Sequence, residues 1–274
     1  MIEELLHPLV CGRFKTDPHY REGHLRIINA LPGRLVLGLH APEMKQIAKQ
    51  ISKHGCQVAL PTGEYKICKD GRQVISYFEA VPEKSLCYEE TVIWGFLINL
   101  QKSPLERSFE MLSHYVPVLD NWAVCDSFCA HAKWMKRADK ELLWSFLQQW
   151  FNSENEFEVR FAVVASMCCF LEEEWLDRLF EIIDNLDFEK ICSRYITCSR
   201  KPEQPQQGTV QGAEPYYVRM GVAWLLATAL AKFPDRTCSF ASTSNLPEDV
   251  LGLYVRKARE SFRTREINPF GKYK

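Results

Sequence analysis

Apolar residues recur at spacings of three and four along almost the whole chain, and few stretches alternate with a period of two. Such spacing places apolar side chains on one face of an α-helix, whereas a half-buried strand requires alternation. The segment APEMKQIAKQISKHG at 41–55 is typical, because Pro42 suits a first helical turn and Gly55 suits a helix end. The sequence therefore predicts an all-α fold.

The expected helices follow one another in pairs. They are expected at residues 7–15, 17–31, 41–55, 88–101, 104–115, 141–152, 156–171, 175–185, 188–198, 216–233 and 247–263. Pairs recur at intervals of roughly 35–45 residues, and one pair alone is too small to hide its apolar face. We therefore expect a single HEAT-like α-solenoid domain over residues 1–274, an α–α superhelix. The polar stretch SRKPEQPQQGTVQGAEP predicts a loop insertion at 199–215.

The net charge of -1 is unevenly distributed. Residues 111–190 carry 7 basic and 15 acidic side chains, and residues 191–274 carry 13 and 7. A protein that only coats nucleic acid is usually more basic, although a local basic face can still bind phosphate groups. No apolar run reaches the roughly 18 residues of a membrane span, so no membrane partner is expected. The 11 cysteines and the lack of a signal-peptide pattern predict reduced core thiols in a cytoplasmic protein.

The stretch VPVLDNWAVCDS at 116–127 contains the clearest functional pair. A proline and two polar residues indicate a helix start, where Asp120 or Asn121 can cap the first amide groups. Trp122 and Asp126 then follow four residues apart on one helical face. An indole beside a carboxylate suits a target that is flat and becomes cationic. The structural alternative is a half-buried Trp packed under a solvated Asp.

Five stretches, in this order and spacing, point to a known family. They are LGLHAPEMKQIAK at 37–49, YEETVIWGFLI at 88–98, LDNWAVCDSF at 119–128, EVRFAVVA at 158–165 and YYVRMGVAWLL at 216–226. Together they make the chain resemble the AlkD-like DNA alkylation repair proteins, which are HEAT-like helical solenoids. The resemblance covers residues 17–263, nearly the whole chain.

The resemblance implies a DNA glycosylase, a hydrolase of base excision repair. Such enzymes break the N-glycosidic bond of cationic N3- or N7-alkylpurines in double-stranded DNA. The family motifs assign catalytic roles to Trp122, Asp126, Arg160 and Trp224. The carboxylate stabilises an oxocarbenium-like sugar and positions a water, the Arg holds a phosphate or orients the carboxylate, and the indoles attract a cationic base. This chemistry requires no cofactor and no metal.

Each of these residues also has a structural alternative. Arg160 can form a salt bridge with Asp126 that only supports the fold, and Trp224 can be plain core because it lies in an apolar helix. The candidates for DNA binding are Lys133, Lys136, Arg137, Lys140 and Arg219. A run of charge is more often a solvated loop, and this applies equally to RKARESFRTR at 256–265.

Cys125, Cys129 and His131 resemble part of a zinc site. The spacing lacks a paired CxxC and these residues lie in an apolar helix, so no metal is expected. The near-neutral charge and the loop at 199–215 leave a second function open. In this alternative the chain is a catalytically silent solenoid that binds non-standard DNA structures or a protein partner. A monomer is the favoured state.

Overall fold

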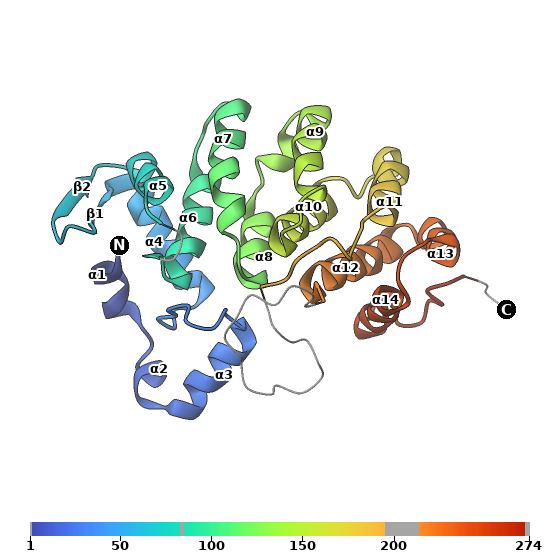
Figure 1. Ribbon diagram of the computed structural model, residues 1–274, viewed down its shortest axis with the longest axis horizontal. Helices are drawn as coiled ribbons and strands as arrows, with labels where there is room; N and C mark the ends of the chain where they lie inside the picture. Colours follow the sequence, from blue (N-terminus) through green and yellow to red (C-terminus); the bar gives the residue numbers. More distant parts are fainter. Residues whose placement is uncertain (1, 83–84, 195–213, 272–274) are drawn as a thin grey trace. The chain divides into compact units, whose positions relative to one another are not determined.

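The structure is a computed structural model and describes residues 2–82, 85–194 and 214–271 (Figure 1). Within these residues the fold is all-α and of the helical-repeat solenoid class, which confirms the prediction from the apolar spacing. The chain divides into two compact units, Met1–Trp134 and Met135–Lys274. A single domain over residues 1–274 stays a prediction. All but the last two residues of the loop predicted at 199–215 lie outside the described residues.

The first unit, Met1–Trp134, contains the helices expected from residue 41 onward. The helix expected at 7–15 is divided into a short 3-10 helix and a short α-helix. Its elements are α1 (Glu3–Leu6), η1 (His7–Leu9), α2 (Gly12–Thr16), α3 (Pro18–Ile28), α4 (Ala41–His54), β1 (Cys56–Ala59), β2 (Tyr65–Cys68), α5 (Gly71–Ala80), α6 (Tyr88–Leu100), α7 (Leu105–Tyr115), η3 (Val116–Val118) and α8 (Trp122–His131).

Helices α4, α6 and α8 pack side by side as one row, and α5 and α7 pack against α6 from outside it (Figure 1). Helix α6 is buried along almost its whole length, which explains why its sequence is apolar on every face. Gly95 permits the close approach of α7, because a Cβ atom there would lie 2.4 Å from the Tyr115 hydroxyl oxygen. The row thus holds α8, with Trp122 and Asp126, against a tightly packed core.

Two buried carboxylates at the start of α6 accept hydrogen bonds from backbone amide groups of other segments. Glu89 and Glu90 are both 0% exposed. Glu89 Oε1 accepts hydrogen bonds from the amide groups of residues 37–39 at 3.0, 2.8 and 3.3 Å. Glu90 accepts from the amides of Ile2 and Cys87 at 2.6 and 3.0 Å, and burial raises the pKa of its carboxyl group. Buried carboxylates are costly unless they are hydrogen-bonded. The Glu89 contacts hold residues 37–39 against α6, and the Glu90 contacts hold Ile2 there.

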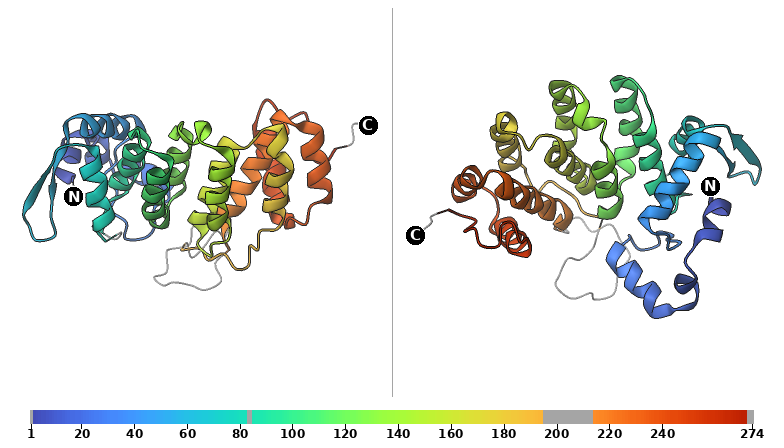
Figure 2. Two further views of the ribbon diagram at one scale, coloured as in Figure 1. Left: turned by 90° about the horizontal axis from the view of Figure 1, so that it is seen from above. Right: turned by 180° about the vertical axis from the view of Figure 1, so that it is seen from behind.

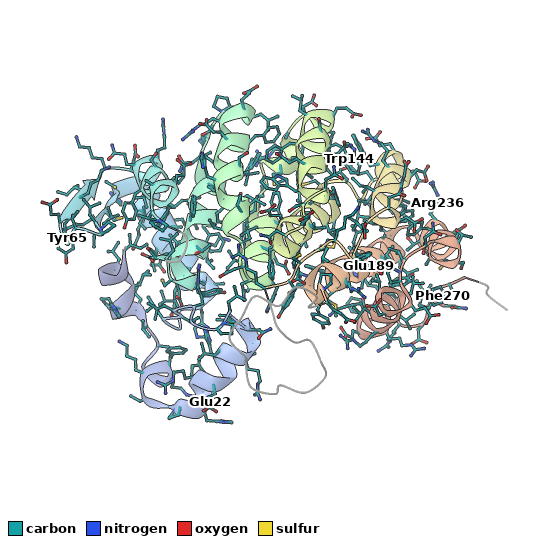
Figure 3. The ribbon with its side chains drawn as sticks, viewed as in Figure 1. Glu22, Tyr65, Trp144, Glu189, Arg236 and Phe270 are labelled. Carbon is teal, nitrogen blue, oxygen red and sulfur yellow. The ribbon has the colours of Figure 1, made fainter. Side chains whose placement is uncertain are left out.

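A short hairpin follows α4 and was not predicted. Strands β1 and β2 pair antiparallel, with Cys56 opposite Cys68. Figure 2 shows the hairpin projecting from the helices of the first unit, and Figure 3 shows Tyr65 on its outer strand. Tyr65 and Ile67 are 52% and 75% exposed, so the hairpin adds surface and little core.

The second unit, Met135–Lys274, repeats the arrangement of the first. Its elements are η4 (Met135–Arg137), α9 (Lys140–Phe151), α10 (Glu156–Cys169), η5 (Glu173–Trp175), α11 (Leu176–Asp184), α12 (Tyr216–Lys232), α13 (Pro234–Thr243) and α14 (Glu248–Glu260). Helices α10, α12 and α14 form the row, while α9 packs on α10 and α13 packs on α12.

One expectation about the second unit was wrong, and one helix was not predicted. Residues 188–194 form no helix, and residues 195–198 of that expected helix lie outside the described residues. The Cys192 amide donates to the Glu154 carbonyl at 2.6 Å, and the Cys192 carbonyl accepts from the Glu156 amide at 3.2 Å. The backbone here pairs with a distant segment instead of coiling on itself. Helix α13 was missed, although Pro234 suits a first helical turn.

Candidate functional site

The start of α8 is fixed by the side chain of Asn121. Its Oδ1 accepts a hydrogen bond from the Ala123 amide at 2.8 Å and caps the helix. Its Nδ2 donates to the carbonyl groups of Ile28 and Asn29 at 2.7 and 3.2 Å, where α3 ends. Asn121 is only 1% exposed, so one buried side chain joins the end of α3 to the beginning of α8.

Asp120 does not cap α8. Its carboxylate lies 3.5 Å from the Arg34 guanidinium, and both side chains are nearly buried. Arg34 also donates to the Thr91 hydroxyl at 2.5 Å and to the Cys87 carbonyl at 3.5 Å, at the start of α6. A buried ion pair is stable when such further hydrogen bonds complete it. The loop before Trp122 is therefore held to the 31–39 connector and to α6.

Trp122 and Asp126 lie one turn apart on α8, and both side chains are half-buried. The Trp122 indole nitrogen donates to the Ile27 carbonyl at 3.2 Å. This bond fixes the ring against the end of α3 while part of the ring stays accessible. The pair thus has the predicted geometry, an indole and a carboxylate on one partly open helical face.

Arg160 lies in the second unit and is 4% exposed. Its Nη1 donates to the Tyr217 carbonyl, and its guanidinium carbon lies 5.9 Å from the Tyr217 ring centre. One turn earlier on α10, Glu156 accepts from the Tyr217 amide and from the Ser193 hydroxyl, each at 2.5 Å. Burial raises the pKa of Glu156. These contacts join the beginnings of α10 and α12. A contact between Arg160 and Asp126 or a phosphate stays a prediction.

Trp224 also lies in the second unit, on α12, and its side chain is half-buried. It lies between Gly221 and Thr228 on α12. A Cβ at Gly221 would lie 3.7 Å from Val163, and the Thr228 hydroxyl lies 3.5 Å from the Met167 sulfur, so this face follows α10. Trp224 is neither wholly core nor wholly surface, and its predicted role beside the base is untested.

The basic candidates differ in their surroundings. Lys140 donates to the Cys169 carbonyl and lies 3.0 Å from Glu172, so it binds the end of α10. Arg219 pairs with Asp249 on α14 at 2.5 Å. Lys133, Lys136 and Arg137 are exposed. DNA binding stays a prediction for all five, and the exposed three are the better placed.

Metal and thiol chemistry receive no support from the described residues. Nowhere among residues 2–82, 85–194 and 214–271 do three His, Cys, Asp or Glu side chains gather as metal ligands. Cys125 and Cys129 are buried in α8. Burial raises the pKa of Cys169 to about 12, which disfavours the reactive thiolate. Within the same residues, none of the helices combines the length and apolar character that crossing a membrane requires.

The residues that sequence reasoning missed are the polar supports of α8: Arg34, Asp120 as an ion-pair partner, and Asn121 as a tether to α3. Only the capping role was visible in the sequence, as Asp-Asn before an apolar helix. Their distant partners lie 53 to 93 residues away along the chain, where no local spacing signals them.

The fold and site together define a helical-repeat protein with a tryptophan and a carboxylate on one capped helix. The chain belongs to the DNA alkylation repair enzyme family, whose model matches residues 16–189. The match includes Trp122, Asp126 and Arg160, and Trp224 lies beyond it. No curated protein and no solved structure matches the chain.

Proposed function

We propose that this protein hydrolyses the N-glycosidic bond of cationic N3- or N7-alkylpurines in double-stranded DNA. The observation that carries the proposal is the pair on α8, where a half-buried indole and a half-buried carboxylate share one face. Membership of the DNA alkylation repair enzyme family supports the substrate class. The cytoplasmic location and the monomeric state stay predictions.

The proposed reaction uses the charge of the damaged base. A purine alkylated at N3 or N7 is cationic, and it leaves as a neutral base with the electron pair of its bond to the sugar. The Asp126 carboxylate stabilises the oxocarbenium-like sugar and positions a water. The water oxygen bonds to the sugar carbon, and its proton passes to solvent by way of the carboxylate. The Trp122 ring attracts the cationic base.

The burial of Arg160 favours a second candidate function. A guanidinium that is 4% exposed and bonded to the Tyr217 carbonyl already has a structural role. Lys140 and Arg219 likewise have carboxylate partners within their own unit. In this alternative the chain keeps the family fold but is catalytically silent, and it binds non-standard DNA structures or a protein partner.

Release of 7-methylguanine from methylated duplex DNA distinguishes the two functions. We expect Asp126→Asn to lower the release rate by about a hundredfold or more, as when an electrostatic stabiliser is removed. The matched control is Glu64→Gln, which removes one charge from the exposed hairpin turn. Equal release by wild type and Asp126→Asn would refute the glycosylase proposal. Loss of release in both variants would point to general charge effects instead.

A further inference from the structure

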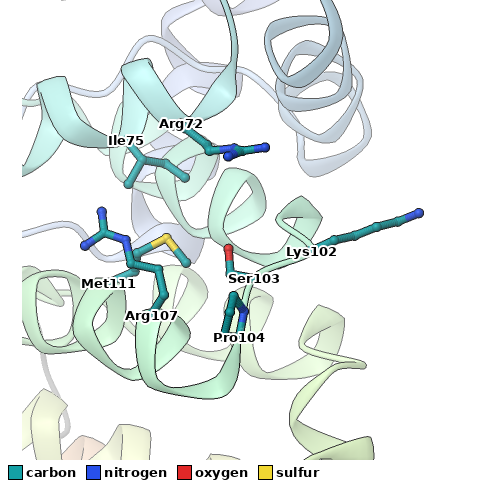
Figure 4. A pocket seen from close by; sticks show the side chains of 7 residues that line it. All are labelled: Arg72, Ile75, Lys102, Ser103, Pro104, Arg107 and Met111. Carbon is teal, nitrogen blue, oxygen red and sulfur yellow. The ribbon is translucent and has the colours of Figure 1, made fainter.

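The first unit contains a cavity of about 200 Å³ between α5 and the start of α7 (Figure 4). Its rim is basic and its floor is apolar, with Ile75 from α5 and Met111 from α7. The basic residues are Arg72, Lys102 and Arg107. Helices α5 and α7 lie outside the row that holds α8, so this pocket is separate from Trp122 and Asp126.

Close backbone packing places Arg72 at the rim. Gly71 begins α5, and a Cβ atom there would lie 3.1 Å from the Ser52 Cα and 3.2 Å from the side-chain nitrogen (Nε2) of Gln101. Glycine therefore lets α5 start directly against α4 and the end of α6. The next residue, Arg72, comes to lie beside the loop that carries Lys102 and Ser103.

The three cations differ in their partners. Arg107 lies 2.7 Å from Glu110 and 3.9 Å from Glu79, and the hydrogen bond with Glu110 raises the pKa of Arg107. Neither Arg72 nor Lys102 forms an ion pair or a side-chain hydrogen bond with any residue that the structure describes. Two cations that have no carboxylate partner among the described residues therefore line one hollow in a chain whose net charge is -1.

The orientation of the side chains divides the pocket. In Figure 4 Arg72 and Lys102 extend toward the same side, and the Ser103 hydroxyl lies between their bases. Arg107 extends toward the opposite side. It pairs with the carboxylate groups of Glu110 and Glu79. A guanidinium, an ammonium and a hydroxyl group are donors that suit the oxygens of a phosphate. The positive end of α7, which no described side chain caps, adds to the same field.

We infer that Arg72, Lys102 and Ser103 form a phosphate-binding site, apart from the α8 pair. The phosphate is carried either by a small phosphate ester or by a nucleic-acid backbone. In both cases two charge-assisted contacts and one neutral hydrogen bond recognise the group. The site does not depend on the proposed base release, and it remains if that proposal fails.

Two assays on the full chain test the inference. The first follows the melting temperature with added inorganic phosphate, compared with chloride and acetate at matched ionic strength. The second measures the binding of undamaged duplex DNA as a function of salt. The pocket variant is Arg72→Gln with Lys102→Gln. The control, Lys66→Gln with Lys69→Gln, removes the same charge from two exposed positions, one in β2 and one just after it. Both variants should match wild type in helical content and in melting without phosphate.

We expect phosphate, and neither chloride nor acetate, to raise the melting temperature of wild type and of the control. The rise should be saturable and should disappear in the pocket variant. If the ligand is a nucleic-acid backbone, the slope of log affinity against log salt also falls by about two in the pocket variant. An unchanged DNA slope with a lost phosphate response identifies a small ester. The inference is wrong if wild type shows no response to phosphate, if acetate acts equally, or if the pocket variant responds like the control.

Discussion

The tether between α3 and α8 gives the sharpest test of how the site is held. We consider Asn121→Ala, which removes three hydrogen bonds at once. One is the cap on the Ala123 amide, and two go to the carbonyl groups of Ile28 and Asn29. Because Asn121 is 1% exposed, water does not readily replace the lost partners.

The magnitude follows from these contacts. Loss of a helix N-cap costs about 1 kcal/mol. Leaving the buried Ile28 carbonyl without its donor costs about 1–3 kcal/mol more. We therefore expect Asn121→Ala to lower the free energy of unfolding by about 2–4 kcal/mol, a large part of the ~5–15 kcal/mol typical of a folded domain. Asn121→Ser keeps a capping oxygen but loses both donor bonds, so it should lose only about 1–3 kcal/mol.

Urea unfolding followed by far-ultraviolet circular dichroism measures these differences. The matched control is Asp70→Ala, because Asp70 caps α5 through one bond to the Gln73 amide at 3.0 Å. Its loss should cost about 1 kcal/mol, the cap alone. If Asn121→Ala costs no more than Asp70→Ala, or if Asn121→Ser is as stable as wild type, the tether contributes nothing and the reasoning fails.

Two further predictions concern the packed rows. Burial raises the pKa of Glu156, so its carboxyl group holds a proton more tightly in the folded protein than in the unfolded chain. The resulting contribution to the free energy of unfolding is fully present below the unfolded pKa near 4.5 and is lost as the pH rises through the folded pKa. Glu156→Gln should thus gain stability relative to wild type between pH 4 and pH 8 in urea titrations; a pH-independent difference would contradict this. Gly95→Ala should lose about 1–3 kcal/mol through overpacking against Tyr115, and Tyr115→Phe in the same chain should restore part of it. If Gly95→Ala were as stable as wild type in thermal melts, α7 would be able to shift and make room for the methyl group, and the prediction would be wrong.

The elements that the sequence predicted well are those with local signals. The expected helix at 41–55 is α4 (Ala41–His54), with Pro42 in its first turn and Gly55 after its end. The sequence indicated Asp120 or Asn121 as the cap of α8, and Asn121 caps the helix. Trp122 and Asp126 share a face because helical spacing requires it. In each case the information lies within one or two helical turns.

Where the sequence misled, contacts between distant segments decided the structure. Residues 188–191 have helical spacing, and Phe188 and Ile191 are indeed buried. Yet Cys192 exchanges backbone hydrogen bonds with the segment before α10, and those bonds require a different course of the chain. Arg160 gave no sign of its bond to the Tyr217 carbonyl, 57 residues away. Local periodicity reports which face of a segment is apolar, but it does not report which partner covers it.

The polar contacts in the first unit converge on its N-terminal segment. Glu89 holds the amide groups of residues 37–39, Arg34 joins Asp120 to α6, and Asn121 and Trp122 bind the last carbonyl groups of α3. Helix α3 carries little buried apolar surface of its own, since Ile28 is its one buried residue. Polar contacts therefore contribute to its position, among them the hydrogen bonds from the loop that begins α8 and the contact of the Tyr20 hydroxyl with His40. The orientation of Trp122 depends in turn on α3, because its indole donates to the Ile27 carbonyl. A change at the end of α3 should therefore alter the position of the indole of the proposed site.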